Sequence, residues 1–294
     1  MAGTIYGTVR VERVSDPREY RGRVEPLLLG DETRHNLMLG LCTTLVEHPG
    51  VYREFYLWLV EDGRSVVGAA ILTPPFNVAV ARPAAEGALP ALARAIAEDG
   101  TPVPGVSAAV PEVDGFVAHW RDVTGAAARV RMASRIYRLT TVTSVAGVPG
   151  RLRAAAPEDR YLLVQWIREF NADVYPEDPP HIEPERVVDL RLQGQGGGFF
   201  LWEDVGRPVC LVGYGGFTPH GARIGPVYTP RELRRRGYAS ALTAGVSAWL
   251  LDQGRQFCFL YTDLANPTSN RIYQQIGYEP ICDSAQYAFE PSDS

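Results

Sequence analysis

The sequence predicts an α/β protein of two domains that share one order of elements. Its 294 residues exceed what one ordinary domain needs. Residues 55–69 and 199–213 repeat one pattern, in which an aromatic run ending in Trp is followed by an acidic turn with Gly-Arg and a second apolar run. This pattern is typical of a β-hairpin. Aromatic strand-like runs at 134–139 and 285–289 end the two halves. A tandem duplication is favoured over a chance similarity of two Trp-containing hairpins.

The boundary between the halves is predicted from composition. Residues 141–150 are rich in glycine and small side chains, as linkers between domains often are. We therefore expect one domain at residues 1–145 and a second at residues 146–294.

The charged residues exclude several classes of protein. The net charge is −5, and the only run of basic residues is Arg234 to Arg236, so no nucleic-acid surface is expected. Every basic side chain other than histidine is an arginine. A P-loop nucleotide site, a pyridoxal enzyme and a protein kinase each need a lysine, and all three are excluded.

The sequence has no long apolar run and no closely spaced histidines or cysteines, which bears on where the protein is located and whether it binds a metal. No apolar run approaches the roughly 18 residues that a membrane span needs, and the N-terminus lacks the pattern of a signal peptide, so we expect a cytoplasmic protein. The histidines are scattered and no Cys-x-x-Cys is present, so no metal site is predicted. The four cysteines are expected to be free thiols, mostly buried.

The C-terminal half reads as alternating strands and helices. Apolar residues recur at helical spacing from Leu162 to Phe170 and again from Ala239 to Leu250, where Gly254 is placed to end the helix. Proline-rich residues 175–180 are expected to form a loop. The remaining expected elements are strands at 152–154, 224–229 and 256–261 and helices at 184–192 and 270–275.

Two segments carry the strongest functional signal. Arg234-Arg235-Arg236-Gly237-Tyr238-Ala239 opens an amphipathic helix. A glycine there permits close approach of an anion, a small alanine leaves room, and N–H groups at a helix N-terminus point toward anionic oxygen. Three arginines oppose the helix dipole, so a bound anion explains them better than a solvated helix start does. Asn266 follows, with Tyr273 seven positions later.

These two segments resemble the GCN5-related N-acetyltransferase (GNAT) superfamily. Its cofactor loop reads Gln/Arg-x-x-Gly-x-Gly/Ala, and an Asn followed by an aromatic, usually Tyr, comes later in the chain. The resemblance is specific over about residues 224–278. It implies two tandem GNAT-like domains, each with a mixed, mostly antiparallel twisted sheet flanked by helices, and acetyl-CoA as the cosubstrate.

The resemblance also implies the site residues. Backbone groups of Val227, Tyr228 and Thr229 would pair with the pantetheine arm, and Asn266 and Ser269 would contact it or order the loop. The pyrophosphate would lie on the cradle, which we define as residues 234–240. The cradle residues are Arg234, Arg235, Arg236, Gly237, Tyr238, Ala239 and Ser240.

Catalysis is assigned less completely. Tyr273 is expected to be the general acid that protonates the leaving thiolate, since a phenol with a pKa of about 10 suits that task. The alternative is that Tyr273 only packs its helix onto the sheet, and that Asn266 only caps a turn. The general base stays open among Glu169, Asp173, Glu177, His220 and a water relay, and for each side chain a solvated surface position is the simpler interpretation.

The N-terminal half lacks both functional segments. No Arg-Gly cradle precedes its helix-like stretch at 90–98, and His119-Trp120-Arg121 stands where the Asn and Tyr would be. We interpret this half as a degenerate copy. The whole chain is predicted to transfer an acetyl group directly to an amine, expected to belong to a small molecule. A non-catalytic acyl-CoA sensor, a longer acyl chain and a protein N-terminus as acceptor are alternatives. Oligomeric state is left open.

Overall fold

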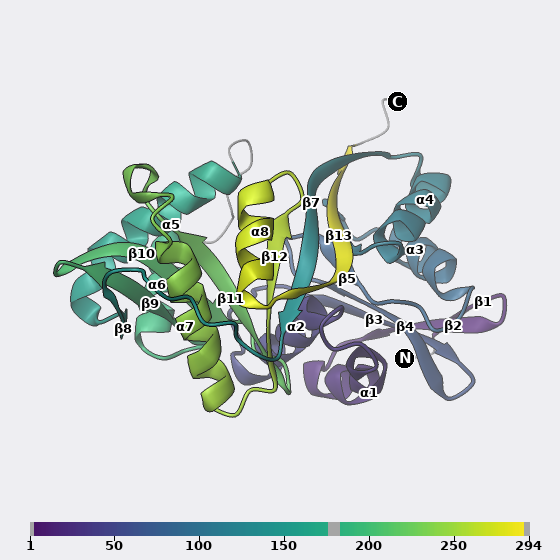
Figure 1. The fold of residues 1–294 in the computed structure, drawn as a ribbon. Helices are drawn as coiled ribbons and strands as arrows, with labels where there is room; N and C mark the ends of the chain where they lie inside the picture. Colours follow the sequence, from purple (N-terminus) through teal and green to yellow (C-terminus); the bar gives the residue numbers. More distant parts are fainter. Residues whose placement is uncertain (1–2, 176–182, 291–294) are drawn as a thin grey trace. The chain divides into compact units, whose positions relative to one another are not determined.

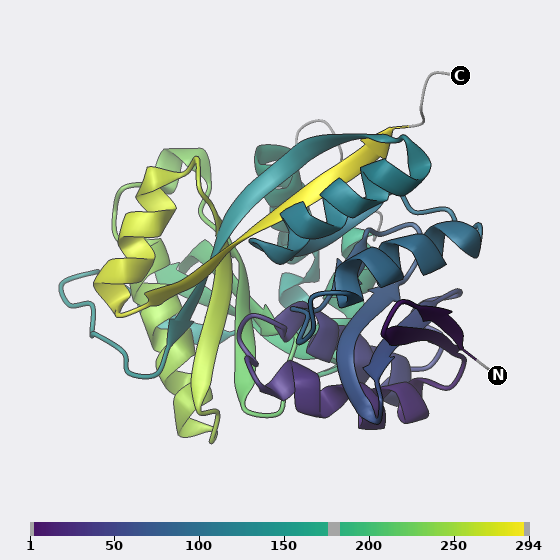
Figure 2. The same ribbon diagram turned by 90° about the vertical axis from the view of Figure 1, so that its right-hand side faces the viewer.

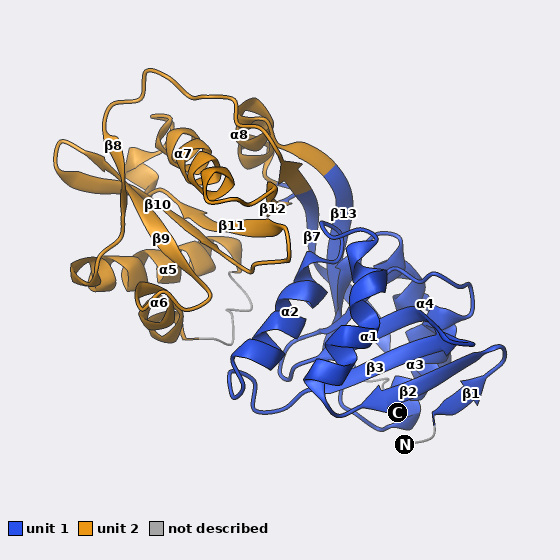
Figure 3. Cartoon of the chain, turned by 90° about the horizontal axis from the view of Figure 1, so that it is seen from below, with its two compact units in different colours: residues 1–136, 263–265, 281–294 blue, residues 137–262, 266–280 orange. Residues whose placement is uncertain are grey.

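A computed structural model describes residues 3–175 and 183–290 and places them in two compact units. Unit 1 comprises residues 1–136, 263–265 and 281–294, and unit 2 comprises residues 137–262 and 266–280 (Figure 3). The boundary predicted between residues 145 and 146 concerns a duplication of the sequence, whereas the two units are defined by contacts in the structure. That boundary stays a prediction. The chain enters unit 2 inside one strand and returns to unit 1 inside another, so each unit is described separately below.

Unit 1 is an α/β unit whose sheet order is β1-β2-β3-β4-β5-β6-β13 (Figure 1). Neighbours from β1 to β5 are antiparallel, whereas β5 and β6 are parallel. Its strands are β1 (Thr4–Tyr6), β2 (Val9–Val14), β3 (Tyr56–Asp62), β4 (Ser65–Leu72), β5 (Val78–Val80) and β6 (Gly105–Ala109), with most of β7 (Ala127–Leu139) and β13 (Glu279–Glu290). Its helices are α1 (Pro17–Leu29), α2 (Asn36–Glu47), α3 (Ala88–Glu98) and α4 (Glu112–Thr124).

The apolar run in β3 is continuous because both faces of this sheet are covered. Leu57 and Leu59 pack with the helices α1 and α2, and Trp58 and Val60 pack with α3 and α4. A strand buried on both faces shows no alternation of apolar and polar residues. The hairpin predicted at 55–69 is confirmed, with Gly63 at φ +61° in its turn.

The last strand of the chain belongs to the sheet of unit 1. Ser284 to Ala288 of β13 pair antiparallel with Ala109 to Gly105 of β6. Figure 2 shows this strand in yellow, with β7 in teal next to it. The strand-like run at 285–289 was predicted, but local sequence gives no sign that it completes the sheet of the other half.

Unit 2 has the sheet order β7-β12-β11-β10-β9-β8. Helices α5 and α6 cover one face, where Phe199, Leu201 and Leu211 are buried, and α7 and α8 cover the other, where Phe200 and Val212 are buried. The strands are β8 (Arg151–Ala154), β9 (Gly197–Asp204), β10 (Arg207–Gly215), β11 (Gly221–Tyr228) and β12 (Phe257–Asp263). The helices are α5 (Arg160–Val174), α6 (Pro184–Leu192), α7 (Tyr238–Asp252) and α8 (Pro267–Ile276), with short 3-10 turns at Pro157–Asp159 and Arg231–Leu233.

Each helix and strand predicted for this half is present, with ends that differ by a few residues. The helix at 184–192 matches α6 at both ends, whereas α8 begins at Pro267, three residues before the predicted start. Asn266 caps that helix and Pro267 opens it, which is the position where proline fits a helix best.

No helix within 3–175 or 183–290 has both the length and the apolar composition that a bilayer crossing requires.

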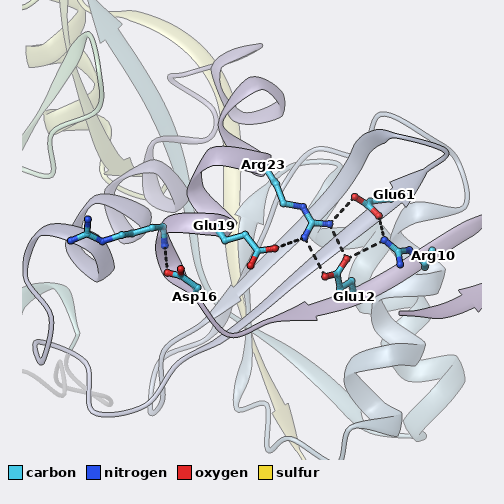
Figure 4. Close-up of polar contacts among 7 residues, drawn as sticks. Arg10, Glu12, Asp16, Glu19, Arg23 and Glu61 are labelled. Carbon is cyan, nitrogen blue, oxygen red and sulfur yellow. Dashed lines mark hydrogen bonds and ion pairs between the residues drawn. The ribbon is translucent and has the colours of Figure 1, made fainter. Parts of the chain in front are cut away.

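A group of ion pairs joins α1 to the first strands of unit 1 (Figure 4). Arg23 lies 2.8 Å from Glu12, 2.7 Å from Glu61 and 2.9 Å from Glu19, measured between nitrogen and oxygen. Arg10 contacts Glu12 and Glu61 as well. The hydrogen bond from Arg23 lowers the pKa of Glu12 below its ordinary value. Burial acts to raise the pKa of Glu61, but hydrogen bonds from Arg10 and Arg23 outweigh it and lower that pKa too.

Replacing Arg23 by methionine tests this group. Arg23→Met keeps much of the apolar stem but leaves Arg10 as the remaining partner of Glu12 and Glu61, so we expect a loss of about 1 kcal/mol at pH 7. Both carboxyl groups have lowered pKa values in the fold, so the stabilisation is present above their unfolded pKa and is lost as pH falls through the folded values. The deficit of the variant should therefore shrink below about pH 4.

The measurement is urea unfolding followed by circular dichroism at pH 7 and pH 3.5. Arg64→Met is the matched control, since Arg64 is exposed in the turn after β3 and no ion pair joins it to another described residue. Equal losses for the two variants at pH 7 would contradict the prediction.

Candidate acyl-CoA site

The site is built around a strand that loses one of its neighbours. Strands β11 and β12 run parallel and pair only over Gly221, Ala222 and Arg223, opposite Phe257 to Phe259. On its other side β11 stays paired with β10 as far as Tyr228. Within the described chain, the β12 side of residues 224–228 therefore has no strand partner, and its backbone N–H and C=O groups are available to an extended ligand.

The strand is irregular where the pairing ends. Gly225 has φ +144° and precedes Pro226, and the register between β10 and β11 shifts between Val212 and Tyr214. Such a bulge bends a strand and redirects its side chains, and bulges are frequent beside active sites. The bend separates the far end of β11 from β12.

The cradle follows directly after β11. Arg235 has φ +66° and Gly237 has φ +84°, and Arg235 is one of two non-glycine residues with positive φ in the described chain. Left-handed residues beside right-handed ones turn successive N–H groups toward a common point, which makes an anion-binding nest. Gly237 is the N-cap of α7, and no side chain caps this N-terminus. The cradle therefore adds free N–H groups and the positive end of the helix dipole.

Gly237 is required by space as well as by conformation. A Cβ added at this position would lie 2.9 Å from Cγ2 of Val148. The next residues, Tyr238, Ala239 and Ser240, form the first turn of α7, and Tyr238 is held by a 2.6 Å hydrogen bond to Asp204. The cradle is thus fixed to the sheet on one side and to the segment that precedes β8 on the other.

The three arginines of the cradle differ in their surroundings. Arg234 donates to Asp173 at 2.6 Å and to the carbonyl oxygen of Thr229 at 2.9 Å. Arg235 and Arg236 are exposed, and Arg236 contacts the carbonyl oxygen of Glu232 at 3.4 Å and also hydrogen-bonds the Tyr238 side chain. Arg231 also pairs with Asp173, a contact that sequence reasoning missed. Arg235 and Arg236 are therefore the arginines most available to an incoming anion.

The end of β11 carries the residues predicted to meet pantetheine. Val227 pairs with Val212 across the sheet. The Tyr228 hydroxyl donates to Glu169 at 2.6 Å, and burial together with this hydrogen bond raises the pKa of Tyr228. Thr229 Oγ1 contacts the buried Cys210 Sγ at 3.2 Å. These side chains fix the strand, and the pairing of its backbone with pantetheine stays a prediction.

Tyr273 is placed near the same end of β11. Its side chain is 8% exposed, and its ring meets that of Tyr278 edge-on at 6.0 Å. Burial raises the pKa of Tyr273 above its ordinary value, with a smaller electrostatic contribution from Cys210. None of the described residues hydrogen-bonds its hydroxyl. Tyr273 and Cys210 belong to the same buried cluster, and Cys210 contacts Thr229, the residue that follows β11.

Asn266 and Ser269 have a structural role in the fold. The Asn266 side chain accepts the backbone N–H of Ser269 at 3.0 Å and so caps α8. The backbone oxygen of Asn266 accepts two hydrogen bonds from Asn270. The pair orients α8, which carries Tyr273, and a contact of either residue with pantetheine stays a prediction.

The four side chains considered as general base are in unequal positions. Ion pairs with Arg231 and Arg234 lower the pKa of Asp173, which makes it a weaker base. His220 precedes β11, at the end opposite Thr229, which at 3.3 Å per residue is roughly 25–30 Å away. Glu169 is hydrogen-bonded by Tyr228 and by Gln165. Glu177 lies outside the described residues.

The corresponding loop of unit 1 has a different backbone. There β5 and β6 are the parallel pair and α3 is the helix that follows. None of residues 81–87 has positive φ, and the N-cap Gly87 has φ −76°. Trp120, in α4, is buried and stacks on Phe116 and Phe289. The N-terminal copy therefore keeps the arrangement of elements without the nest.

Comparisons with known proteins find a matching family profile and solved structures of similar fold. The profile of the acetyltransferase (GNAT) family matches residues 162–278. No curated protein sequence matches the chain. Among solved structures, a Drosophila protein superposes with a TM-score of 0.67 at 11% identity, covering 96% of this chain and 99% of its own.

Two other solved structures carry names that describe their class. A GCN5-related N-acetyltransferase from Sphaerobacter thermophilus has a TM-score of 0.63 at 15% identity, with 97% of this chain and 96% of that one covered. A tandem GNAT protein from the clavulanic acid biosynthesis pathway has a TM-score of 0.60 at 18% identity, with 97% and 100% covered. At these identities the likeness concerns the fold.

The fold is therefore that of two tandem GNAT-like domains. Within this fold, residues 162–278 match the profile of the acetyltransferase (GNAT) family.

The need for glycine in the cradle can be tested on stability alone. Gly237→Ala should destabilise the protein more than Gly206→Ala does. Both positions have positive φ, +84° and +71°, so both alanines carry a similar conformational strain of about 1–2 kcal/mol. Only at position 237 would the new methyl group also meet Val148, since nothing lies within 4 Å of a Cβ at position 206.

Thermal unfolding of the two variants and of the double variant Gly237→Ala/Val148→Ala measures the difference. Removing the Val148 side chain should recover the excess at position 237, after correction for Val148→Ala alone. Equal losses at the two glycines would show that Val148 does not constrain the cradle.

Proposed function

We propose that the protein is an N-acetyltransferase that uses acetyl-CoA and transfers its acetyl group directly to an amine. The observation that carries the proposal is the free edge of β11 at residues 224–228, which leads into the uncapped N-terminus of α7. A strand-like pantetheine arm fits the edge, and a pyrophosphate fits the N–H groups that follow.

The residues of this chain supply the binding groups. Backbone N–H and C=O groups of Val227, Tyr228 and Thr229 would pair with the pantetheine amides. N–H groups of the cradle would hold the pyrophosphate, and Arg235 and Arg236 would add charge-assisted hydrogen bonds. An acetyl thioester bound in this way supplies an electrophilic carbonyl carbon at the bulged part of β11.

Tyr273 supports the chemistry as a proton donor. The amine nitrogen forms a bond to the acetyl carbon, the carbon–sulfur bond breaks, and the phenol proton goes to the sulfur. Of the bases considered, we retain Glu169, because Asp173 is paired with two arginines. Its hydrogen bond with Tyr228 places the Glu169 carboxylate at the same end of the strand as Thr229.

Binding of acetyl-CoA is the first measurement. Isothermal titration should give one site per chain, and Arg236→Glu should weaken the affinity at least tenfold, because it puts a negative charge beside the pyrophosphate. Arg207→Glu is the matched control, with the same change of charge at an exposed position, the first residue of β10. Its affinity should stay within about twofold of the wild type.

Absence of any heat with acetyl-CoA, supported by equilibrium dialysis, would remove the proposed cosubstrate. Equal weakening by the two charge changes would instead show that the cradle is not where the anion binds.

The role of Tyr273 is tested by rate and by pH. Tyr273→Phe should keep the Kd for acetyl-CoA while kcat falls about 100-fold, because the proton donor is lost. Burial raises the pKa of this phenol above 10, so the wild-type enzyme should show no loss of kcat from phenol ionisation below pH 10.

Release of CoA is followed by chromatography, with Tyr161→Phe, an exposed tyrosine of α5, as the control. An unchanged kcat in Tyr273→Phe would assign the side chain to packing alone. Tight binding of acetyl-CoA without turnover of any amine would favour the acyl-CoA sensor over the enzyme.

A further inference from the structure

Two arginines lie on the face of the unit 2 sheet that α5 and α6 cover. Arg191, in the last turn of α6, extends over β10, and Arg223 projects from β11. Glycines form the surface under them. A Cβ at Gly213 would lie 2.7 Å from Nη1 of Arg191, and one at Gly216 would lie 3.1 Å from the guanidinium carbon of Arg223. Larger residues at these glycines would push the guanidinium groups away.

Neither arginine has a carboxylate partner among the residues that the structure describes. Nη1 of Arg191 makes a 3.4 Å contact with the carbonyl oxygen of Gly225, and its guanidinium lies 5.0 Å from the centre of the Phe199 ring. Arg223 is partly buried and makes no ion pair there. Elsewhere in the chain, arginines such as Arg23, Arg153 and Arg234 are paired with carboxylates. Among the residues described, no carboxylate compensates the positive charge of Arg191 and Arg223.

The pKa of Arg191 is consistent with a guanidinium that is buried beside another positive charge. Burial lowers the pKa of Arg191 to about 10, and the charge of Arg223 lowers it further in the same direction. The charged form of Arg191 is therefore held at a cost in the free protein, which a bound anion would remove. A capping role at the end of α6 would account for Arg191 but not for Arg223 on β11.

Arg191 and Arg223 lie close to the point where β11 stops pairing with β12. Gly225, whose carbonyl Arg191 contacts, is two residues beyond Arg223, the last residue of β11 that pairs with β12. The guanidinium groups thus lie beside the start of the free edge, while the cradle follows its other end. A group bound by the arginines would lie beside the part of the edge farthest from the cradle, where an acetyl group carried by pantetheine would end.

We propose that the acceptor is an amine that also carries a carboxylate, and that Arg191 and Arg223 bind this carboxylate. This inference rests on the proposed function. Two guanidinium forks match the planar carboxylate geometry and orient it, which lysine or a neutral donor would do less well. The pair would fix one end of the acceptor and so direct its amine toward the acetyl carbon.

The test uses the full-length protein, acetyl-CoA and matched pairs of amines. The pairs are glycine and glycinamide, β-alanine and β-alaninamide, and 4-aminobutyrate and 4-aminobutanamide, together with the neutral and cationic amines ethanolamine, tyramine and putrescine. Acetylated products are measured by mass spectrometry. We expect kcat/KM for the best acid to exceed that of its amide by at least tenfold.

Variants then connect this preference to the two side chains. Arg191→Gln and Arg223→Gln should each lower kcat/KM for the acid by tenfold or more and leave that of the amide within threefold, with the Kd for acetyl-CoA unchanged. Arg186→Gln is the control, since Arg186 is exposed on the same helix. If Arg191→Gln fails to fold, Arg223→Gln alone keeps the test valid.

The outcomes separate the inference from the function on which it rests. Acetylation of amides or of the neutral and cationic amines as fast as the acids would overturn the inference and keep the acetyltransferase. Binding of acetyl-CoA with no acid acetylated also counts against the inference. Absence of acetyl-CoA binding would instead overturn the proposed function.

Discussion

The site depends on the early end of pairing between β11 and β12. Parallel pairing stops at Arg223 and Phe259, yet β11 continues to Tyr228 because β10 still supports its other side. Buried backbone groups need hydrogen-bond partners, so a strand edge left open inside a fold creates a place for an extended ligand. The bulge and Gly225 produce the separation, and α7 begins where the edge ends. Strand edge, nest and helix terminus thus follow one another along the chain.

Charge is distributed unequally along this edge. At the cradle end, Asp173 pairs with Arg231 and Arg234, whereas Arg235 and Arg236 are exposed. At the other end, Arg191 and Arg223 lie over glycines with no carboxylate partner in the described chain. Between them, Glu169 and Tyr228 form a hydrogen-bonded pair, and the Tyr273 phenol is buried near Cys210. This distribution of charge would favour an anionic group at each end of the free edge of β11. It would also place the groups proposed to transfer protons between those two ends.

The two units share an architecture but differ in the loop that matters for chemistry. Unit 1 buries apolar residues on both faces of its sheet. Trp120 occupies the position that corresponds to the Asn and Tyr of the C-terminal half, and it packs between two aromatic rings. Its loop at 81–87 has no left-handed residue, so successive N–H groups do not converge there as they do after β11. Unit 1 can therefore fold without a cradle, because the residues that pack its core are different from the residues that would form an anion-binding loop.

Sequence alone determined the elements of the C-terminal half, the two Trp-containing hairpins and the start of the helix after Gly237, because periodicity, capping residues and glycine act over a few positions. The match of α6 to residues 184–192 and the left-handed Gly237 are examples. Only the tertiary structure decided where β13 pairs, because a strand's partner is set by contacts over long chain separations. The ion pairs of Asp173 with two arginines are also visible only in the tertiary structure. The same holds for the burial of Arg191 beside the charge of Arg223, because from sequence an arginine on a helix is expected to be exposed to solvent.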